Sequence, residues 1–174
     1  MCPGRRDLRC APGMKRRTCQ PCTACCDGWV KMTIEGVPVS PGHPCPHSTP
    51  QGCDNYANRP VDPCVNFACG WIIPQSPLPD WMKPDNARVI VLFAKFHWQG
   101  APVDLAVPVC RRIPPRALVW LRNFAETQRR PLIHTEQVIE GGRFQGQQRW
   151  FGHGPEPFLR DLVRWQGEGR SLWT

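Results

Sequence analysis

The sequence predicts an α+β fold, in which a small cysteine-rich module precedes a ββα-ββα unit with an antiparallel four-stranded sheet and two helices. Two observations favour this fold. Eight of the eleven cysteines lie between Cys19 and Cys69, and the chain beyond residue 87 follows a strand–strand–helix rhythm twice. The 174 residues are 41% hydrophobic and 21% charged, a composition typical of a globular chain.

Residues 1–17 predict a basic N-terminal tail. Six Lys and Arg residues face a single acid, Asp7, and proline and glycine interrupt any regular element. The tail is expected to be solvated or, alternatively, to touch nucleic acid or an acidic protein surface. Cys2 and Cys10 lie in this tail and are expected to be free thiols. No apolar segment follows the basic start and none is long enough to span a membrane, so we expect a cytoplasmic protein with no membrane contact.

Residues 18–74 predict the cysteine module. The segment Cys19-Gln-Pro-Cys22-Thr-Ala-Cys25-Cys26 opens it, and the remaining cysteines are Cys45, Cys53, Cys64 and Cys69. Clustered thiols in a reducing compartment favour metal ligation over disulfides, and an odd total fits complete pairing poorly. The module has few large aliphatic residues, so we expect a bound metal to stabilise its fold.

Short elements are expected within the module. Residues 28–34 alternate as a short strand does, and residues 36–38 turn the chain. The proline-rich residues 41–47 form a loop that carries Cys45, with His43 and His47 as candidates to replace a thiol. Residues 75–87 are again rich in proline and predict a linker or a wrapping segment.

Soft thiolate ligands suit zinc or an iron–sulfur cluster. Eight cysteines would satisfy two four-coordinate zinc sites, which makes zinc the preferred cofactor. The alternative is one iron–sulfur cluster on the Cys-x2-Cys-x2-Cys run, completed by Cys53, Cys64 or Cys69. Side chains of adjacent residues diverge, so the Cys25-Cys26 pair indicates two metals, or one polynuclear site, lying side by side.

The order of these residues resembles a known family. Cys19-x2-Cys22-x2-Cys25-Cys26, a Cys45 loop, Gly52-Cys53-x2-Tyr56-x2-Arg59-Pro60 and then Cys64 are similar to the CxxCxxCC cysteine-cluster family (YkgJ type), described as a zinc- or iron-chelating domain. The likeness covers residues 18–74, about a third of the chain, and implies metal chelation through these cysteines. The flagellin lysine methylases look similar over such a cluster, although they are much longer and no methyl-donor motif is recognisable here.

Positive charge is expected beside the sulfur ligands. A zinc ion with four thiolates carries a negative formal charge, which the guanidinium groups of Arg16, Arg17 and Arg59 would balance by hydrogen bonds to sulfur. Tyr56 belongs to the same supporting segment as Arg59. The alternative for Arg59-Pro60 is a turn with an exposed arginine.

The α+β domain is expected over residues 88–174. Residues 88–98 and 103–109 predict one strand pair, and residues 132–139 and 143–151 a hairpin. Helices are expected from Pro114-Pro115 to about Arg130 and from Pro155 onward, both on one sheet face. The other face would carry the cysteine module or a partner. Cys110 is expected to be a small buried residue, and His97, His134 and His153 to be structural.

The sequence contains no phosphate-binding loop, no supported Ser-His-Asp pattern and no His-Glu-x2-His, so no catalytic residues are assigned and enzyme activity stays open. A site closed by four thiolates is usually structural or electron-carrying. The favoured interpretation is a metal-binding module that docks on an unidentified macromolecule. The alternatives are an iron–sulfur redox protein or cluster-dependent modification enzyme, and a basic, zinc-stabilised nucleic-acid-binding protein, which the net charge of +8 permits.

Overall fold

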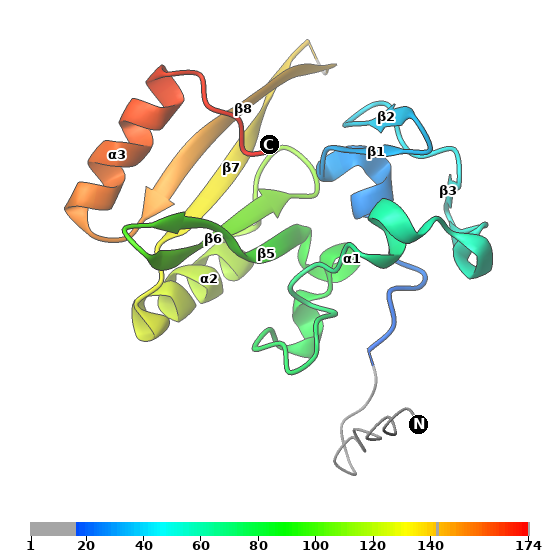
Figure 1. Ribbon diagram of the computed structural model, residues 1–174, viewed down its shortest axis with the longest axis horizontal. Helices are drawn as coiled ribbons and strands as arrows, with labels where there is room; N and C mark the ends of the chain where they lie inside the picture. The colour runs from blue at the N-terminus through cyan, green and yellow to red at the C-terminus, as the bar shows by residue number, and fades with distance from the viewer. Residues whose placement is uncertain (1–16, 142, 174) are drawn as a thin grey trace, which may run out of the picture.

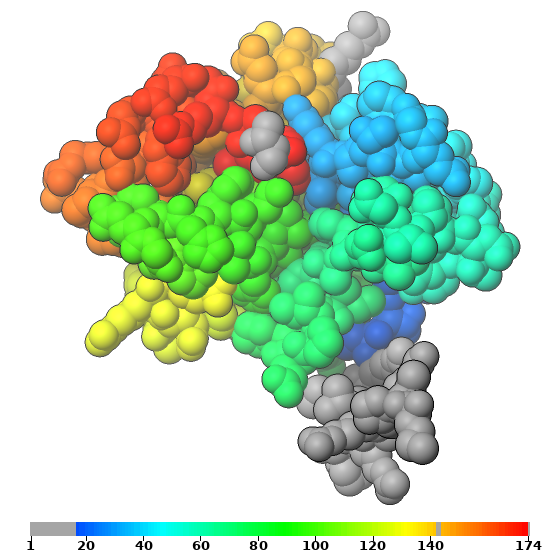
Figure 2. Space-filling model, viewed as in Figure 1, coloured from blue at the N-terminus to red at the C-terminus, as the bar shows by residue number. Residues whose placement is uncertain are grey.

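The computed structural model describes residues 17–141 and 143–173, and the chain has the expected mixed α+β fold (Figure 1). The expected basic tail up to residue 16, with Cys2 and Cys10, lies outside the described residues. A four-stranded sheet forms the centre of the molecule. The cysteine module lies at one side of the sheet and helix α3 at the other, and Figure 2 shows the same division of the surface.

The cysteine module is built from short elements. A one-turn helix, η1 (Cys25–Trp29), precedes a hairpin of β1 (Met32–Ile34) and β2 (Val37–Val39). A smaller hairpin follows, β3 (Ser48–Thr49) with β4 (Gly52–Cys53), and then the short helices η2 (Tyr56–Asn58) and η3 (Val61–Val65). The strand expected from residue 28 begins only at Met32, because η1 occupies the residues before it.

The proline-rich stretch after the module packs against the sheet. It contains η4 (Asp80–Met82) and α1 (Pro84–Ala87). Leu78 and Met82 are buried, Met82 completely, in one cluster with Val89, Val91 and Leu121. This segment therefore wraps the sheet, one of the two roles expected for it, and its apolar side chains belong to the main core.

The central sheet has the strand order β5 (Val89–Trp98), β6 (Ala101–Pro108), β7 (Leu132–Glu140) and β8 (Arg143–His153). β5 and β6 are antiparallel, as are β7 and β8, but β6 and β7 run parallel. The prediction of a wholly antiparallel sheet is therefore wrong. Helix α2 (Pro115–Gln128) carries the chain back along the sheet between β6 and β7, so both strands start at the same end.

The two helices cover opposite faces, not one face as expected. Ala117 and Leu121 of α2 pack in one cluster with Val91 and Ala106. Phe158 and Leu162 of α3 (Glu156–Gly167) pack in another cluster, with Ile90, Leu105 and Ile133. Adjacent strand residues point to opposite faces, so these clusters lie on different sides. One helix on each face removes apolar surface from water on both sides of the sheet.

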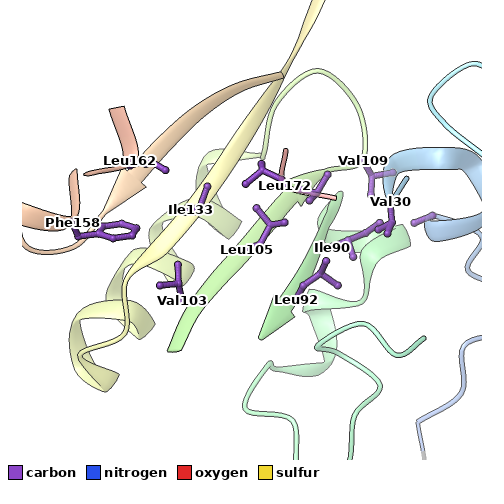
Figure 3. Packing of buried hydrophobic residues seen from close by; sticks show 12 residues of the cluster. Val30, Ile90, Leu92, Val103, Leu105, Val109, Ile133, Phe158, Leu162 and Leu172 are labelled. Atoms are coloured by element: carbon purple, nitrogen blue, oxygen red, sulfur yellow. The ribbon is translucent and has the colours of Figure 1, made fainter. Parts of the chain in front are cut away.

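The cysteine module completes the core on the α3 face. Figure 3 shows Val30 beside Val109 and Ile90, at the end of the sheet away from Phe158. Helix α3, the module and the C-terminal residue Leu172 therefore share this face. The expectation that the module would lie on a sheet face free of helices is therefore wrong, because a helix covers each face and the module packs on the face of α3.

The outer edge of β5 is paired with the end of the module. The backbone N–H of Gly70 donates a hydrogen bond to the carbonyl of Val91, 2.6 Å away. A Cβ atom at Gly70 would lie 2.8 Å from the ring of Phe93, so glycine permits this close approach.

Candidate metal centre

The eight candidate cysteines come from separate turns of the module. Cys19 and Cys22 precede η1, Cys25 and Cys26 open it, and Cys45 lies in the loop between β2 and β3. Cys53 ends β4, Cys64 lies in η3, and Cys69 lies in the turn before residue 70. All eight are free thiols; Cys45 is buried and the other seven are partly buried. No disulfide therefore competes with metal ligation at any of them.

Backbone and side-chain hydrogen bonds bring these segments together. The N–H of Cys45 donates to the carbonyl of Cys26 at 2.8 Å. The carboxylate of Asp27 accepts from the hydroxyls of Thr23, at 3.0 Å, and Ser48, at 2.6 Å. Asp27 thus ties the turn that carries Cys25 and Cys26 to the segment that follows Cys45.

A glycine makes this contact possible. Gly28 has a φ of 92°, and a Cβ atom built there would lie 2.1 Å from the carbonyl carbon of Ser40. Only a residue without a side chain lets η1 lie this close to the end of β2. The close approach sets the position of the chain that leads to Cys45.

One group of thiols lies against the sheet. Cys22, Cys25 and Cys69 all pack against the core cluster that contains Ile90 and Leu92. Burial, together with the neighbouring thiolates of Cys22 and Cys69, raises the pKa of Cys19 to about 11. Burial also raises the pKa of Cys22 and of Cys69. We refer to Cys19, Cys22, Cys25 and Cys69 as the inner group.

A second group lies around the β1–β2 hairpin. Cys26 and Cys64 pack against a cluster of Ile34, Val39 and Cys45. Burial raises the pKa of Cys45 and of Cys64, and both also lie within the electrostatic reach of Cys26 and Cys53. We refer to Cys26, Cys45, Cys53 and Cys64 as the outer group.

The two groups meet at adjacent residues. The Sγ atoms of Cys25 and Cys26 are 3.9 Å apart. The hydrogen bond between these thiols raises the pKa of Cys25 well above its ordinary value, with burial as the next cause, and lowers that of Cys26. Cys25 and Cys26 thus fall in different groups, and the side-by-side metals expected from this pair stay a prediction.

The chemistry of the donor set fits a soft or borderline metal. Sulfur is the donor at all eight positions, and buried thiolates without a cation are unfavourable, as the raised pKa of most of these thiols indicates. Within residues 17–141 and 143–173, no three or more His, Cys, Asp or Glu side chains are already grouped closely enough to hold an ion. Ligation by either group would therefore draw its sulfur atoms inward.

Arg59 lies beside the outer group. Its Nη1 donates to the carbonyl of Tyr56 at 2.5 Å, and its guanidinium carbon lies 3.9 Å from the centre of the Tyr56 ring. The positive charge of Arg59 opposes the rise in the pKa of Cys64 caused by burial. Tyr56 thus orients Arg59, and Arg59 brings positive charge to the sulfur atoms.

Arg17 has a different partner from the one expected. Its guanidinium donates to the carbonyls of Trp71, at 2.7 Å, and Leu78, at 2.6 Å, and it pairs with Asp80 at 2.9 Å. The cation near the inner group is Lys83, whose charge opposes the rise in the pKa of Cys19. Its Nζ donates to the carbonyl of Gln20 at 3.3 Å. The sequence gives no local sign that Lys83 lies near these thiols, because 63 positions separate it from Gln20. Arg16, the other arginine expected beside the sulfur atoms, lies outside the described residues.

The five histidines and Cys110 were the other residues singled out in the sequence. His47 bonds to Asp54 through Nδ1 at 2.7 Å, and the backbone of His43 pairs with Ser40. His134 is buried, His153 bonds to Glu126 at 3.0 Å, and His97 is exposed. Cys110 is exposed, so the prediction of a buried residue is wrong: the residue follows the end of β6 in a bend that turns its backbone outward from the core, with a φ of 148°.

Comparison with protein-family models, with curated proteins and with solved structures finds no match. Membership of the CxxCxxCC family therefore stays a prediction from the motif. No helix in the described part of the chain has the length and apolar character needed to cross a membrane.

Proposed function

We propose that this chain is a metal-binding cysteine-cluster protein that holds two zinc ions in adjacent four-thiolate sites. The inner group, Cys19, Cys22, Cys25 and Cys69, forms one site, and the outer group, Cys26, Cys45, Cys53 and Cys64, forms the other. The observation that carries the proposal is the packing of three thiols, Cys22, Cys25 and Cys69, against one apolar cluster and of three others, Cys26, Cys45 and Cys64, in or against a second. We assign Cys19 to the first set and Cys53 to the second from their electrostatic contacts.

Four thiolate ligands close a zinc site, so the role that follows from this donor set is structural. The module has short elements and a small apolar cluster of its own, and the metal would hold those elements in place. In this proposal the stabilised module serves as a docking surface for a macromolecule, and the net charge of +8 favours an acidic partner.

The alternative function is iron–sulfur chemistry at the inner group. The inner group combines the run Cys19-x2-Cys22-x2-Cys25 with Cys69, and this run matches three positions of a ferredoxin-type motif. A cluster there would support electron transfer or a cluster-dependent modification reaction. The outer group would then hold a separate metal.

The test is metal content with an absorption spectrum on protein purified without oxygen. We expect about two zinc ions per chain and no visible absorption. A Cys110→Ser variant is the control, because this exposed cysteine belongs to neither group and its loss should leave the metal content unchanged. A brown protein with iron and acid-labile sulfide would favour the alternative, and a protein without bound metal would contradict both.

A further inference from the structure

A cavity of about 300 Å³ lies where the cysteine module meets the edge of the sheet. Its walls come from residues 30–32, residues 63–73, the β5 residues 92–95, and Trp173 at the C-terminal end. Figure 1 shows the C-terminal end of the chain beside the segment that leads into β1. The volume is at the lower end of the range of small-molecule pockets, roughly 300–1,000 Å³.

The walls combine aromatic surface with positive charge. Phe67, Phe93 and Trp173 contribute aromatic rings. Among the described residues that line the cavity, Lys31 and Lys95 are charged and no acidic residue is present. Neither lysine has an ion-pair partner in the part of the chain that the structure describes. The Nζ of Lys95 lies 5.8 Å from the centre of the Phe96 ring. No described carboxylate therefore neutralises the charge of either lysine.

The strand that forms one wall departs from regular geometry at the cavity. The pairing of β5 with β6 shifts register between Leu92 and Phe96, and Ala94 within this bulge has a φ of 49°. Leu92, Phe93 and Lys95, in and beside this bulge, line the cavity.

A buried ion pair holds the bulge in place. The N–H of Ala94 donates to Asp104 at 2.8 Å, and Asp104, 3% exposed, is paired with Arg130. A left-handed alanine and a buried carboxylate each cost free energy, and such features cluster at functional sites. Here they position the strand segment that carries Phe93 and Lys95.

We propose that this cavity binds a small organic anion with an aromatic body, whose carboxylate is held by Lys31 and Lys95. The rings of Phe67, Phe93 and Trp173 offer flat apolar surface to the body of the ligand. Lysine ammonium groups contact a carboxylate as point charges, through charge-assisted hydrogen bonds. This site is distinct from the sulfur groups and goes beyond the proposed function.

The test is calorimetric titration of the purified, metal-analysed protein with 2-naphthoate, and with the uncharged 2-naphthamide for comparison. We expect saturable binding of 2-naphthoate that is at least about tenfold tighter than that of the amide. The affinity should fall as salt is added, because both lysines are partly exposed.

Two variants locate the anion. Lys31→Gln and Lys95→Gln should each weaken 2-naphthoate binding about tenfold and leave amide binding unchanged. Arg160→Gln is the control, because it removes one positive charge from the exposed side of α3, where Arg160 pairs with Glu156. The zinc content of all three variants should equal that of the parent, so a failure of the metal proposal is seen separately.

Three results would overturn the anion site. The first is that 2-naphthoate shows no saturable binding up to millimolar concentration. The second is that 2-naphthoate and 2-naphthamide bind with equal affinity. The third is that Lys31→Gln and Lys95→Gln both bind 2-naphthoate as tightly as the parent does.

Discussion

The carboxylate of Asp104 accepts a hydrogen bond from the backbone N–H of Ala94 on the neighbouring strand, at 2.8 Å. The same oxygen is paired with Arg130, which lies between α2 and β7. One buried side chain of β6 therefore links the bulge in β5 to Arg130, two residues before β7 begins. The left-handed conformation of Ala94 depends on this acceptor, because a regular ladder partner is missing there.

The loss of stability should be larger when Arg130 is replaced than when Asp104 is replaced. Arg130→Met leaves a buried carboxylate without its cation, and we expect a loss of about 3 kcal/mol in the free energy of unfolding. Asp104→Asn keeps an acceptor for Ala94 and leaves a partly exposed guanidinium that water can reach, so we expect only about 1–2 kcal/mol. Urea unfolding measures both; equal losses, or a larger loss for Asp104→Asn, would contradict this account.

His134 should make the protein sensitive to mild acid. Burial lowers its pKa from 6.5 to about 4, with further contributions from the charges of Arg122 and His153. Between these two values the unfolded chain binds a proton that the folded chain does not, so the free energy of unfolding should fall as the pH drops from 6.5 to about 4. The loss should reach at most about 3 kcal/mol.

The variant His134→Phe should reduce this pH dependence. Its ring can stack on Phe151, as the imidazole does at a centroid distance of 5.3 Å. His97→Gln is the matched control, since His97 is exposed. Thermal unfolding at several pH values between 4 and 7 gives the slopes. The prediction is wrong if His134→Phe has the same slope as the parent.

Two left-handed glycines should differ in how they tolerate alanine. Gly36 has a φ of 81° with no atom near the added Cβ, so Gly36→Ala should cost about 1 kcal/mol. Gly28→Ala adds a clash with the backbone of Ser40, so it should cost at least about 2 kcal/mol more. In the proposed function it should also lower the zinc content, because the path to Cys45 shifts. Similar stability and zinc content in the two variants would argue against this role for Gly28.

Pairs of cysteine variants test the assignment of sulfurs to sites. Cys25→Ser with Cys69→Ser removes two ligands of the inner group, and about one zinc ion per chain should remain. Cys64→Ser with Cys69→Ser removes one ligand from each group, so both ions should be lost or weakly held. Metal analysis after dialysis against a weak chelator measures the difference. The same zinc content in the two double variants would reject the assignment.

Local sequence signals predicted the elements of the second half well. The alternation in β5 to β8 and the proline at the start of each long helix place these elements within a few residues of their positions. The direction of β7 relative to β6, and the face that each helix covers, were predicted wrongly. Both depend on how the crossover through α2 lies on the sheet, which the periodicity of a single element does not encode.

The candidate site was predicted as a set of residues but not as an arrangement. The spacing of the cysteines singled out all eight as candidate ligands, which stays a prediction, and it left their grouping open. The grouping follows from contacts between distant segments, such as the hydrogen bond from Cys45 to Cys26. The cation beside Cys19 is Lys83, and its role depends on the wrapping of the proline-rich stretch, which composition alone does not position.

The pairing of Gly70 with Val91 also bears on self-association. An unpaired edge strand is a template on which further chains can add, and the module occupies part of that template at β5. At the opposite edge, β8 carries the exposed Arg149 and the left-handed Gly146, which discourage the addition of a flat strand. The module therefore covers one border of the sheet, and we expect a chain without the module to expose a β5 edge to which other chains can add.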